Sequence, residues 1–124
     1  LFTIKQKSKL DTLISLANNK YKTKIINLGV ITEKKCLENI NCSRYLIYPS
    51  RFESLGLPLI EANILNIPII SSNEEYVKEV CEPIATFDSL SIEDTKKIIK
   101  KFYFKTNVIS PKKFYKSNNF LELL

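Results

Sequence analysis

The chain has 124 residues, a formal net charge of +6, an apolar content of 44% and a charged content of 26%, the composition of an ordinary globular protein. It contains no run of about 18 apolar residues, so the sequence predicts no membrane-spanning helix. It contains no histidine, which excludes Ser-His-Asp and Cys-His catalysis by these residues. This length predicts one domain, residues 1–124.

The cysteines give little support to a metal site. There are three, an odd number, and they form no C-x-x-C pair. Without histidine a zinc site would need carboxylates, so we expect no metal ion and instead buried or half-buried free thiols in a reducing cytosol. The cysteines are Cys36, Cys42 and Cys81.

The start of the chain resembles neither a signal peptide nor a natural beginning. It lacks a basic region followed by a long apolar core, and the whole sequence has no methionine. We therefore expect a segment of a longer cytoplasmic protein.

The positive charge is carried mostly by lysine, with Arg44 and Arg51 the only arginines. Arginine is favoured for reading bases and phosphates, so the composition argues against a nucleic-acid partner. The densest basic run, residues 96–105, places lysines and large apolar residues at helical spacing. It is typical of a surface helix packed on a core. The alternative is a peripheral contact with anionic lipid at the inner face of a membrane.

Short β-branched or fully apolar runs predict the strands. Runs that are apolar at every position, such as residues 45–48, are typical of strands covered on both faces in a parallel sheet. The predicted strands, in chain order, are residues 1–4, 23–28, 45–48, 67–71 and 83–87.

Helix starts are predicted from capping residues and proline. Asn18-Asn19 are expected to end the first helix, and Ser91 with Asp94 resembles a capping box before the basic helix. The third helix is expected over residues 58–65. The predicted starts are Ser8, Thr32, Pro58, Asn73 and Ser91, with a final amphipathic piece after Pro111.

Strands and helices alternate about every 20 residues, which predicts an α/β fold with a doubly wound parallel sheet, Rossmann-like in pattern. Right-handed crossovers place every strand-to-helix loop at one edge of such a sheet. Ligands bind outside the carboxyl ends of the strands. The loop after residues 45–48 lies at that edge.

This loop and the following helix, PSRFESLGLPLIEANILNIPIISS over residues 49–72, hold the main candidate residues. Backbone amides just before a helix lack partners and face the positive end of its dipole, which suits a phosphate. Gly56 permits a positive φ or a close approach of ligand to backbone. Glu61, one turn into the helix, could accept hydrogen bonds from a ribose diol, and Glu53 would project from the loop. The amides are those of Ser54, Leu55, Gly56 and Leu57.

A structural interpretation stays open beside this one. Glu61 could simply be an acid near a helix N-terminus, and Glu53 a solvated loop residue. A position in a fold does not prove a function.

The stretch resembles the signature of the retaining glycosyltransferases of family 4, in the C-terminal domain of the GT-B fold. That signature reads roughly P-S, E-x-[FL]-G-L-P-x-x-E-A, G-x-P and a strand ending in S-N. The loop at Leu28-Gly29-Val30-Ile31 and the stretch FDSLSIED also resemble the family. The matching residues are Pro49-Ser50, Glu53, Leu55-Gly56-Leu57-Pro58, Glu61-Ala62, Ile67-Pro68 and Ser71-Ser72-Asn73.

The resemblance implies a donor-binding domain for a nucleotide-diphosphate sugar, with retaining transfer of the sugar to a hydroxyl. Glu61 would bind the ribose, and Glu53, the catalytic candidate, would contact the transferred sugar. Residues 54–57 would contact the distal phosphate and sugar, and Gly29, Val30 and Ile31 would lie against the base. It implies no cofactor and no metal, an N-terminal acceptor domain as partner, and a role in surface polysaccharide, lipopolysaccharide or capsule synthesis. A non-catalytic nucleotide-sugar-binding or membrane-docking module is the alternative.

Three departures accompany the resemblance. Asn66 stands where the family has glycine, so we expect a left-handed backbone conformation there. Lys5-Gln6-Lys7 replaces a glycine turn of the family. The family's first strand, with its donor-binding arginine and lysine, has no counterpart, so we expect the isolated chain to be inactive in transfer.

Overall fold

The chain divides between Thr32 and Glu33 into two units. The structure, a computed structural model, describes residues 4–103. Each unit is described here by itself, so a single domain over residues 1–124 stays a prediction.

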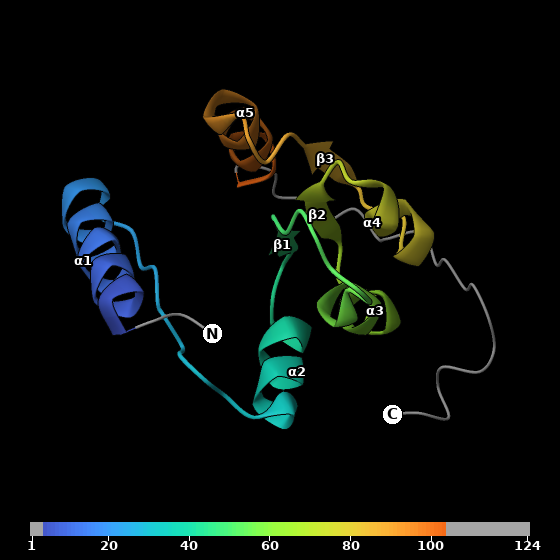
Figure 1. Ribbon diagram of the computed structural model, residues 1–124, viewed down its shortest axis with the longest axis horizontal. Helices are drawn as coiled ribbons and strands as arrows, with labels where there is room; N and C mark the ends of the chain where they lie inside the picture. Colours follow the sequence, from blue (N-terminus) through green and yellow to red (C-terminus); the bar gives the residue numbers. More distant parts are fainter. Residues whose placement is uncertain (1–3, 104–124) are drawn as a thin grey trace. The chain divides into compact units, whose positions relative to one another are not determined.

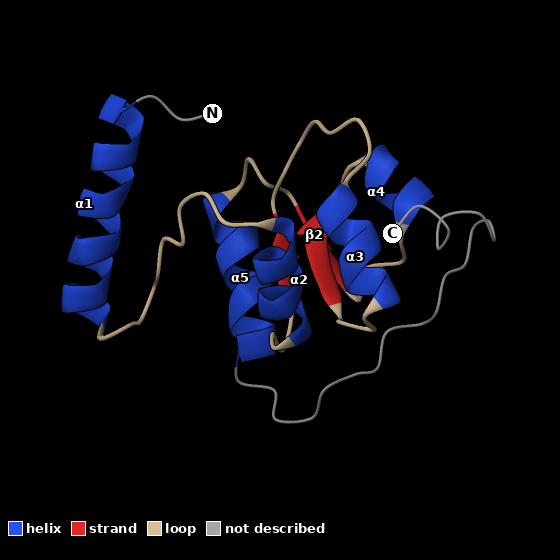
Figure 2. Cartoon of the chain, turned by 90° about the horizontal axis from the view of Figure 1, so that it is seen from below, coloured by secondary structure: helices blue, strands red, loops and turns tan. Residues whose placement is uncertain are grey.

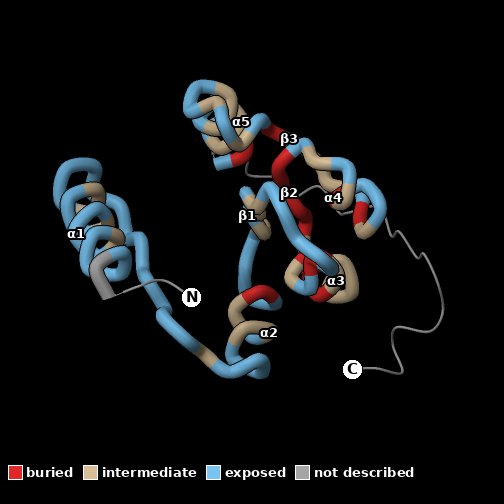
Figure 3. The backbone as a smooth tube through the Cα atoms, in the orientation of Figure 1, coloured by how far each residue is buried: buried red, intermediate tan, exposed pale blue. Residues whose placement is uncertain are grey.

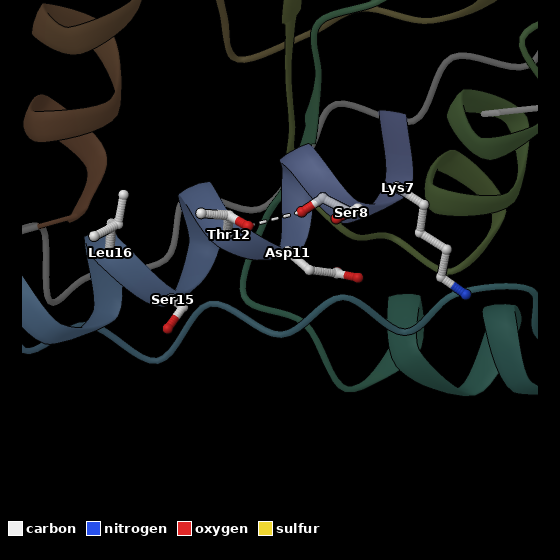
Figure 4. A pocket seen from close by; sticks show the side chains of 6 residues that line it. All are labelled: Lys7, Ser8, Asp11, Thr12, Ser15 and Leu16. Carbon is white, nitrogen blue, oxygen red and sulfur yellow. Dashed lines mark hydrogen bonds between the residues drawn. The ribbon is translucent and has the colours of Figure 1, made fainter. Parts of the chain in front are cut away.

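The first unit consists mainly of α1 (Ile4–Tyr21), shown in blue in Figure 1. The helix begins before Ser8, and Ile4 is helical, which makes the predicted strand wrong at that residue; residues 1–3 lie outside the described part. The helix also continues through Asn18-Asn19 to Tyr21. A shallow hollow on its surface is lined by Lys7, Ser8, Asp11, Thr12, Ser15 and Leu16 (Figure 4).

Residues 23–28, predicted as a strand, belong to no strand. The side chain of Asn18 takes the place of a neighbouring strand. Its Oδ1 accepts from the Ile25 N–H at 2.8 Å, and its Nδ2 donates to the Ile25 carbonyl at 2.9 Å. The backbone of Ile25 is thus satisfied by one amide side chain, and the β-branched run stays outside any sheet in the described structure.

The second unit contains a parallel sheet of three strands in the order β1-β2-β3. β1 (Leu46–Tyr48) pairs with β2 (Ile69–Ser72), which pairs with β3 (Ala85–Phe87). Helices alternate with the strands along the chain, and Figure 2 shows the helices in blue beside the red strands, which confirms the predicted α/β class. These helices are α2 (Glu33–Asn41), α3 (Leu57–Ile64), α4 (Glu75–Val80) and α5 (Ile92–Tyr103).

Helices cover both faces of β2, as the doubly wound pattern predicts. Successive residues of a strand point to opposite faces. Ile69 packs in a cluster with Leu59 of α3 and Val77 of α4, whereas Ile70 packs with Phe102 of α5. All four residues of β2 are buried, and Figure 3 shows this strand in red.

β1 differs from the prediction that both its faces are covered. It lies at the edge of the described sheet, and Ile47 is 44% exposed. The strands that follow a proline also begin later than predicted, at Ile69 and Ala85. Pro68 and Pro83 have no N–H to donate to a neighbouring strand.

The end of α3 confirms the conformation predicted for Asn66, whose φ is 56°. Its N–H donates to the Asn63 carbonyl at 3.2 Å, and the Ile67 N–H donates to the Ala62 carbonyl at 2.8 Å. These two bonds form a Schellman motif with asparagine in the position that glycine usually holds. The motif directs the chain from α3 into β2.

The starts of the other helices agree only in part with their predicted caps. The Ser91 Oγ accepts from the Asp94 N–H at 3.2 Å, as in a capping box, but the Asp94 carboxylate accepts from the Asp88 N–H rather than from Ser91. Glu74, not Asn73, is the N-cap of α4. The piece predicted after Pro111 lies outside the described residues.

The free cysteines differ in exposure. Cys81 is buried and Cys36 is half-buried, but Cys42 is exposed, which makes the prediction wrong for this residue. Burial raises the pKa of the Cys81 thiol to about 11.

Candidate functional site

The loop between β1 and α3 is tied to the carboxyl end of the sheet. The Ser50 carbonyl accepts a hydrogen bond from the hydroxyl of Ser72, the last residue of β2. It also accepts one from the Tyr76 hydroxyl on α4, at 2.8 Å. The loop thus lies at the edge where parallel α/β sheets bind ligands, as the sequence predicts.

Gly56 ends this loop as the N-cap of α3, with φ 63° and ψ 44°. A Cβ added there would lie 3.1 Å from the Leu59 Cδ1 atom and 3.8 Å from the Tyr76 Cε2 atom. Both the left-handed conformation and the close contact favour glycine. The prediction of a positive φ is confirmed. Leu57, rather than Pro58, is the first residue of the helix.

The backbone amides of residues 54–57 are available to a ligand. Within residues 4–103 none of them donates a hydrogen bond. Ser54, Leu55 and Leu57 are exposed, and α3 directs the positive end of its dipole toward them. This arrangement can hold a phosphate or another anion.

Glu61 is the buried acid of the site. It lies in α3 and is 7% exposed, and its carboxylate has no hydrogen bond or ion pair with the other described residues. Burial, and then the negative charge of Glu33, raise the pKa of its carboxyl group. A buried acid without a partner is unfavourable in the free protein. Ligand hydroxyl groups that donate hydrogen bonds to it would remove part of that cost.

Glu53 lies in the exposed part of the loop. Burial raises the pKa of Tyr48, and the negative charge of Glu53 raises it further. A hydrogen bond with the Ser50 side chain lowers the pKa of Tyr48. Glu53 is therefore a solvent-facing carboxylate at the end of β1, free to contact a ligand.

Three residues of this region were not predicted as site residues, although Ser72 belongs to the stretch that resembles the family: Tyr48, Ser72 and Tyr76. Each lies at or just after the carboxyl end of a strand, where side chains from neighbouring strands converge. A search for polar residues at strand ends could have found the first two. Tyr76 lies within α4, and no motif marks it.

The predicted base-contacting residues belong to the first unit. Gly29 has φ 64°, and its N–H donates to the Asn27 Oδ1 atom at 3.0 Å. Val30 is 97% exposed, and Ile31 is half-buried. Their part in a site with Glu61 stays a prediction. The hollow on α1 (Figure 4) contains none of the predicted site residues.

Two further features bear on ligands and location. Among residues 4–103, no three Asp, Glu or Cys side chains come together as metal ligands would. In the same part of the chain, no helix has the length and apolar character needed to cross a bilayer.

Comparison with known proteins gives a family and a distant relative. The model of the family described as "Glycosyl transferases group 1" matches residues 5–116. An "Uncharacterized 41.2 kDa protein in cps region" of Klebsiella pneumoniae is 28% identical over 79 residues. The alignment covers 64% of this chain and 22% of the relative, so the chain spans only a small part of that protein's length. No solved structure gives a significant match.

Proposed function

Because the chain belongs to the group 1 glycosyltransferases, we propose that it binds the nucleotide-diphosphate sugar that serves as donor in the transfer reaction. The observation that carries this proposal is Glu61, a buried carboxylate without a partner in the described structure. It lies in the same helix that follows the free amides of residues 54–57. A nucleotide sugar has a ribose diol, which a carboxylate can bind, and phosphates, which backbone amides can bind.

The proposed roles follow from the chemistry of each group. Glu61 accepts hydrogen bonds from the ribose hydroxyls, and the amides of residues 54–57 donate to the distal phosphate and the sugar. Glu53, in the exposed loop, contacts the transferred sugar. Gly29, Val30 and Ile31 contact the base. The reaction retains the configuration of the sugar and uses no metal or other cofactor in this proposal.

Positioning and electrostatic stabilisation would carry the rate. As the bond to the sugar breaks, negative charge grows on the departing diphosphate, and amides directed at it stabilise the transition state. Glu53 would stabilise the positive charge that develops on the sugar ring. Holding donor and acceptor together lowers the entropic part of the barrier.

The acceptor belongs to the proposal for the whole protein. We propose that an N-terminal domain of the same protein binds a hydroxyl acceptor. The Klebsiella relative is named after a cps region, which supports a role of the whole protein in surface polysaccharide synthesis. We propose the cytoplasm as the place of this reaction.

Titration of the 124-residue chain with UDP-glucose and GDP-mannose, followed by amide NMR shifts, tests donor binding. We expect affinity in the millimolar range, about −4 kcal/mol, with the largest shifts at residues 54–57. Glu61→Ala should weaken binding by about tenfold or more, whereas Glu79→Ala, at an exposed acid of α4, should not change it. Equal binding by both variants would mean that Glu61 is structural. Transfer assays on the whole protein would then separate an enzyme from a donor-binding module without activity.

A second candidate function, docking on an anionic membrane, is favoured by α5. Its lysines at positions 96, 97, 100 and 101 are exposed. Ile92 is 82% and Tyr103 is 74% exposed, and helical spacing places both on one face with Lys96. Phe102 on another face packs into the core. Exposed apolar side chains beside lysines are typical of helices that lie in a membrane interface.

Cosedimentation with vesicles tests this second function. We expect binding to phosphatidylcholine vesicles that contain phosphatidylglycerol, and none to pure phosphatidylcholine. Reversing Lys96 and Lys100 to glutamate should abolish it. Reversing Lys34 and Lys78, which changes the net charge equally, should weaken it far less. Equal loss in the two double variants would indicate only a general effect of net charge.

A further inference from the structure

The carbonyl of Ser50 joins three elements of the second unit. Ser50 follows β1, and its carbonyl oxygen accepts from Ser72 at the end of β2 and from Tyr76 on α4. Ser72 is fully buried. A carbonyl oxygen has two lone pairs, and both are used here by side-chain hydroxyls. The start of the loop is thereby fixed to the sheet.

Tyr76 also lies close to the other end of the loop. Its Cε2 atom is 3.8 Å from the position that a Cβ of Gly56 would occupy. The ring packs against the core cluster that includes Leu59 and Val77. One side chain, itself held by the core, therefore bonds to the residue that begins the loop and lies close to the residue that ends it.

We propose that Tyr76 is a positioning residue for the donor loop, residues 50–56. By bonding to the start of the loop and limiting the space beside its end, it sets the places of Glu53 and of the free amides before the donor arrives. The inference deepens the proposed function and rests on it for the identity of the ligand. Tyr76 need not touch the donor.

The physical reason is preorganisation. Residues 51–55 are exposed, and apart from the Ser50 Oγ bond to the Phe52 carbonyl, at 3.2 Å, no described hydrogen bond involves them. A loop held only weakly by its own contacts must lose conformational freedom when it binds a ligand. Fixing its start and limiting the space at its end beforehand reduces that loss and so raises the affinity. The alternative is that Tyr76 serves only to pack the core.

Tyr76→Phe separates these roles because it keeps the ring and removes only the hydroxyl. Tyr45→Phe is the matched control, since the Tyr45 hydroxyl is buried and has no partner in the described structure. The readout is the backbone ¹⁵N order parameter of residues 51–55 in the 124-residue chain. We expect it to fall in Tyr76→Phe from the rigid range, about 0.85, toward about 0.6. Tyr45→Phe should leave it unchanged.

Ser72→Ala combined with Tyr76→Phe is the second test, because each single variant leaves the Ser50 carbonyl one donor. We expect the double variant to loosen the loop by more than the sum of the single changes, as for groups that share a partner. Strict additivity would show that the two hydroxyls do not act on one carbonyl.

Affinity for UDP-glucose or GDP-mannose completes the experiment, measured well below the unfolding temperature. We expect Tyr76→Phe to raise the dissociation constant about twofold to tenfold, the effect of one lost hydrogen bond. A variant that is only less stable, with unchanged loop order and unchanged affinity, would overturn the proposal. If the wild-type chain bound neither nucleotide sugar but Tyr76→Phe still loosened the loop, the positioning role would hold and the proposed function would fail.

Discussion

At the scale of a single residue, Gly56 connects the loop to the core. It holds a left-handed conformation, and it lets the Leu59 side chain approach within 3.1 Å of where a Cβ would be. Gly29 has nearly the same φ, 64°, but has no atom within 4 Å of its Cβ position. The two glycines therefore share the conformational requirement and differ in packing.

Replacing each glycine by alanine measures these two effects separately. We expect Gly56→Ala to lower the free energy of unfolding by about 2–3 kcal/mol, from backbone strain of about 1–2 kcal/mol and overpacking against Leu59. Gly29→Ala should cost only the strain, about 1 kcal/mol. Urea unfolding gives both values. Equal losses would mean that the Leu59 side chain moves aside without cost.

Glu61 is predicted to make stability depend on pH. Burial, and then the charge of Glu33, raise its pKa in the folded chain. Between its unfolded and folded pKa values the folded chain binds more protons, so the free energy of unfolding falls as pH rises through this window. The contribution is fully present below the unfolded pKa. Glu61→Gln cannot ionise and should lack this fall.

Urea unfolding of the wild type and of Glu61→Gln tests this pH dependence. The measurements run from about pH 4, near the usual pKa of glutamate, to about pH 8. We expect Glu61→Gln to be at least as stable as the wild type at neutral pH and to lose that advantage in acid. A variant clearly less stable at neutral pH would show that the carboxylate makes a favourable bond in the folded chain.

At the scale of elements, the turn before α5 contains two serines, Ser89 and Ser91, whose hydroxyls differ in their hydrogen bonds. The Ser91 Oγ accepts from the Asp94 N–H, and the Asp94 carboxylate accepts from the Asp88 N–H at 2.8 Å. Ser89 lies two residues before Ser91, and its hydroxyl is buried and has no partner in the described part of the chain. α5 packs on β3 and places Phe102 in the core, so its start affects one whole face of the sheet.

Alanine at each serine should therefore give opposite results. We expect Ser91→Ala to destabilise the chain by about 1 kcal/mol, the usual effect of losing an N-cap. Ser89→Ala should be neutral or stabilising, because a buried hydroxyl without a partner costs about 1–3 kcal/mol. Thermal unfolding of the two variants checks this. A loss at Ser89 as large as that at Ser91 would mean that the Ser89 hydroxyl is bonded in solution.

Some elements could be predicted from sequence because their signals are local. The turn at Asn66 follows from the conformational tolerance of asparagine, and the apolar run of β2 from burial on both faces. Residues 23–28 misled the prediction because a β-branched run becomes a strand only where a partner strand is available. The side chain of Asn18 bonds to Ile25 instead, and no local pattern indicates that contact.

At the scale of the whole molecule, the residues proposed to contact the donor belong to different units of the chain. The loop at residues 50–56 and Glu61 belong to the second unit, and Gly29 to Ile31 to the first. The sequence predicted the acids and the glycine because a family motif joins them. It did not predict Tyr76, because the bond from Tyr76 to Ser50 spans 26 residues and depends on how α4 packs.

In the whole protein that contains this chain, replacing Glu61 and replacing Glu53 should affect different kinetic parameters. Glu61 is proposed to bind a ribose that does not change in the reaction, so it contributes equally to substrate and transition state. Glu61→Ala should weaken the donor by about 1.5–3 kcal/mol, roughly tenfold to a hundredfold, mainly in KM. Glu53 is proposed to contact the sugar that develops positive charge. Its negative charge should favour the transition state, so Glu53→Gln should lower kcat more than it raises KM.

Steady-state kinetics of the two variants against the donor measure this difference, with Glu79→Ala as the control at an exposed acid of α4. The control should leave both parameters unchanged. If Glu53→Gln altered only KM, Glu53 would be a binding residue and not a catalytic one. If neither glutamate variant differed from the control, the buried Glu61 would be explained by packing alone. The loop after β1 would then hold no hydroxyl group of the donor through a carboxylate, because residues 49–61 contain no other acid.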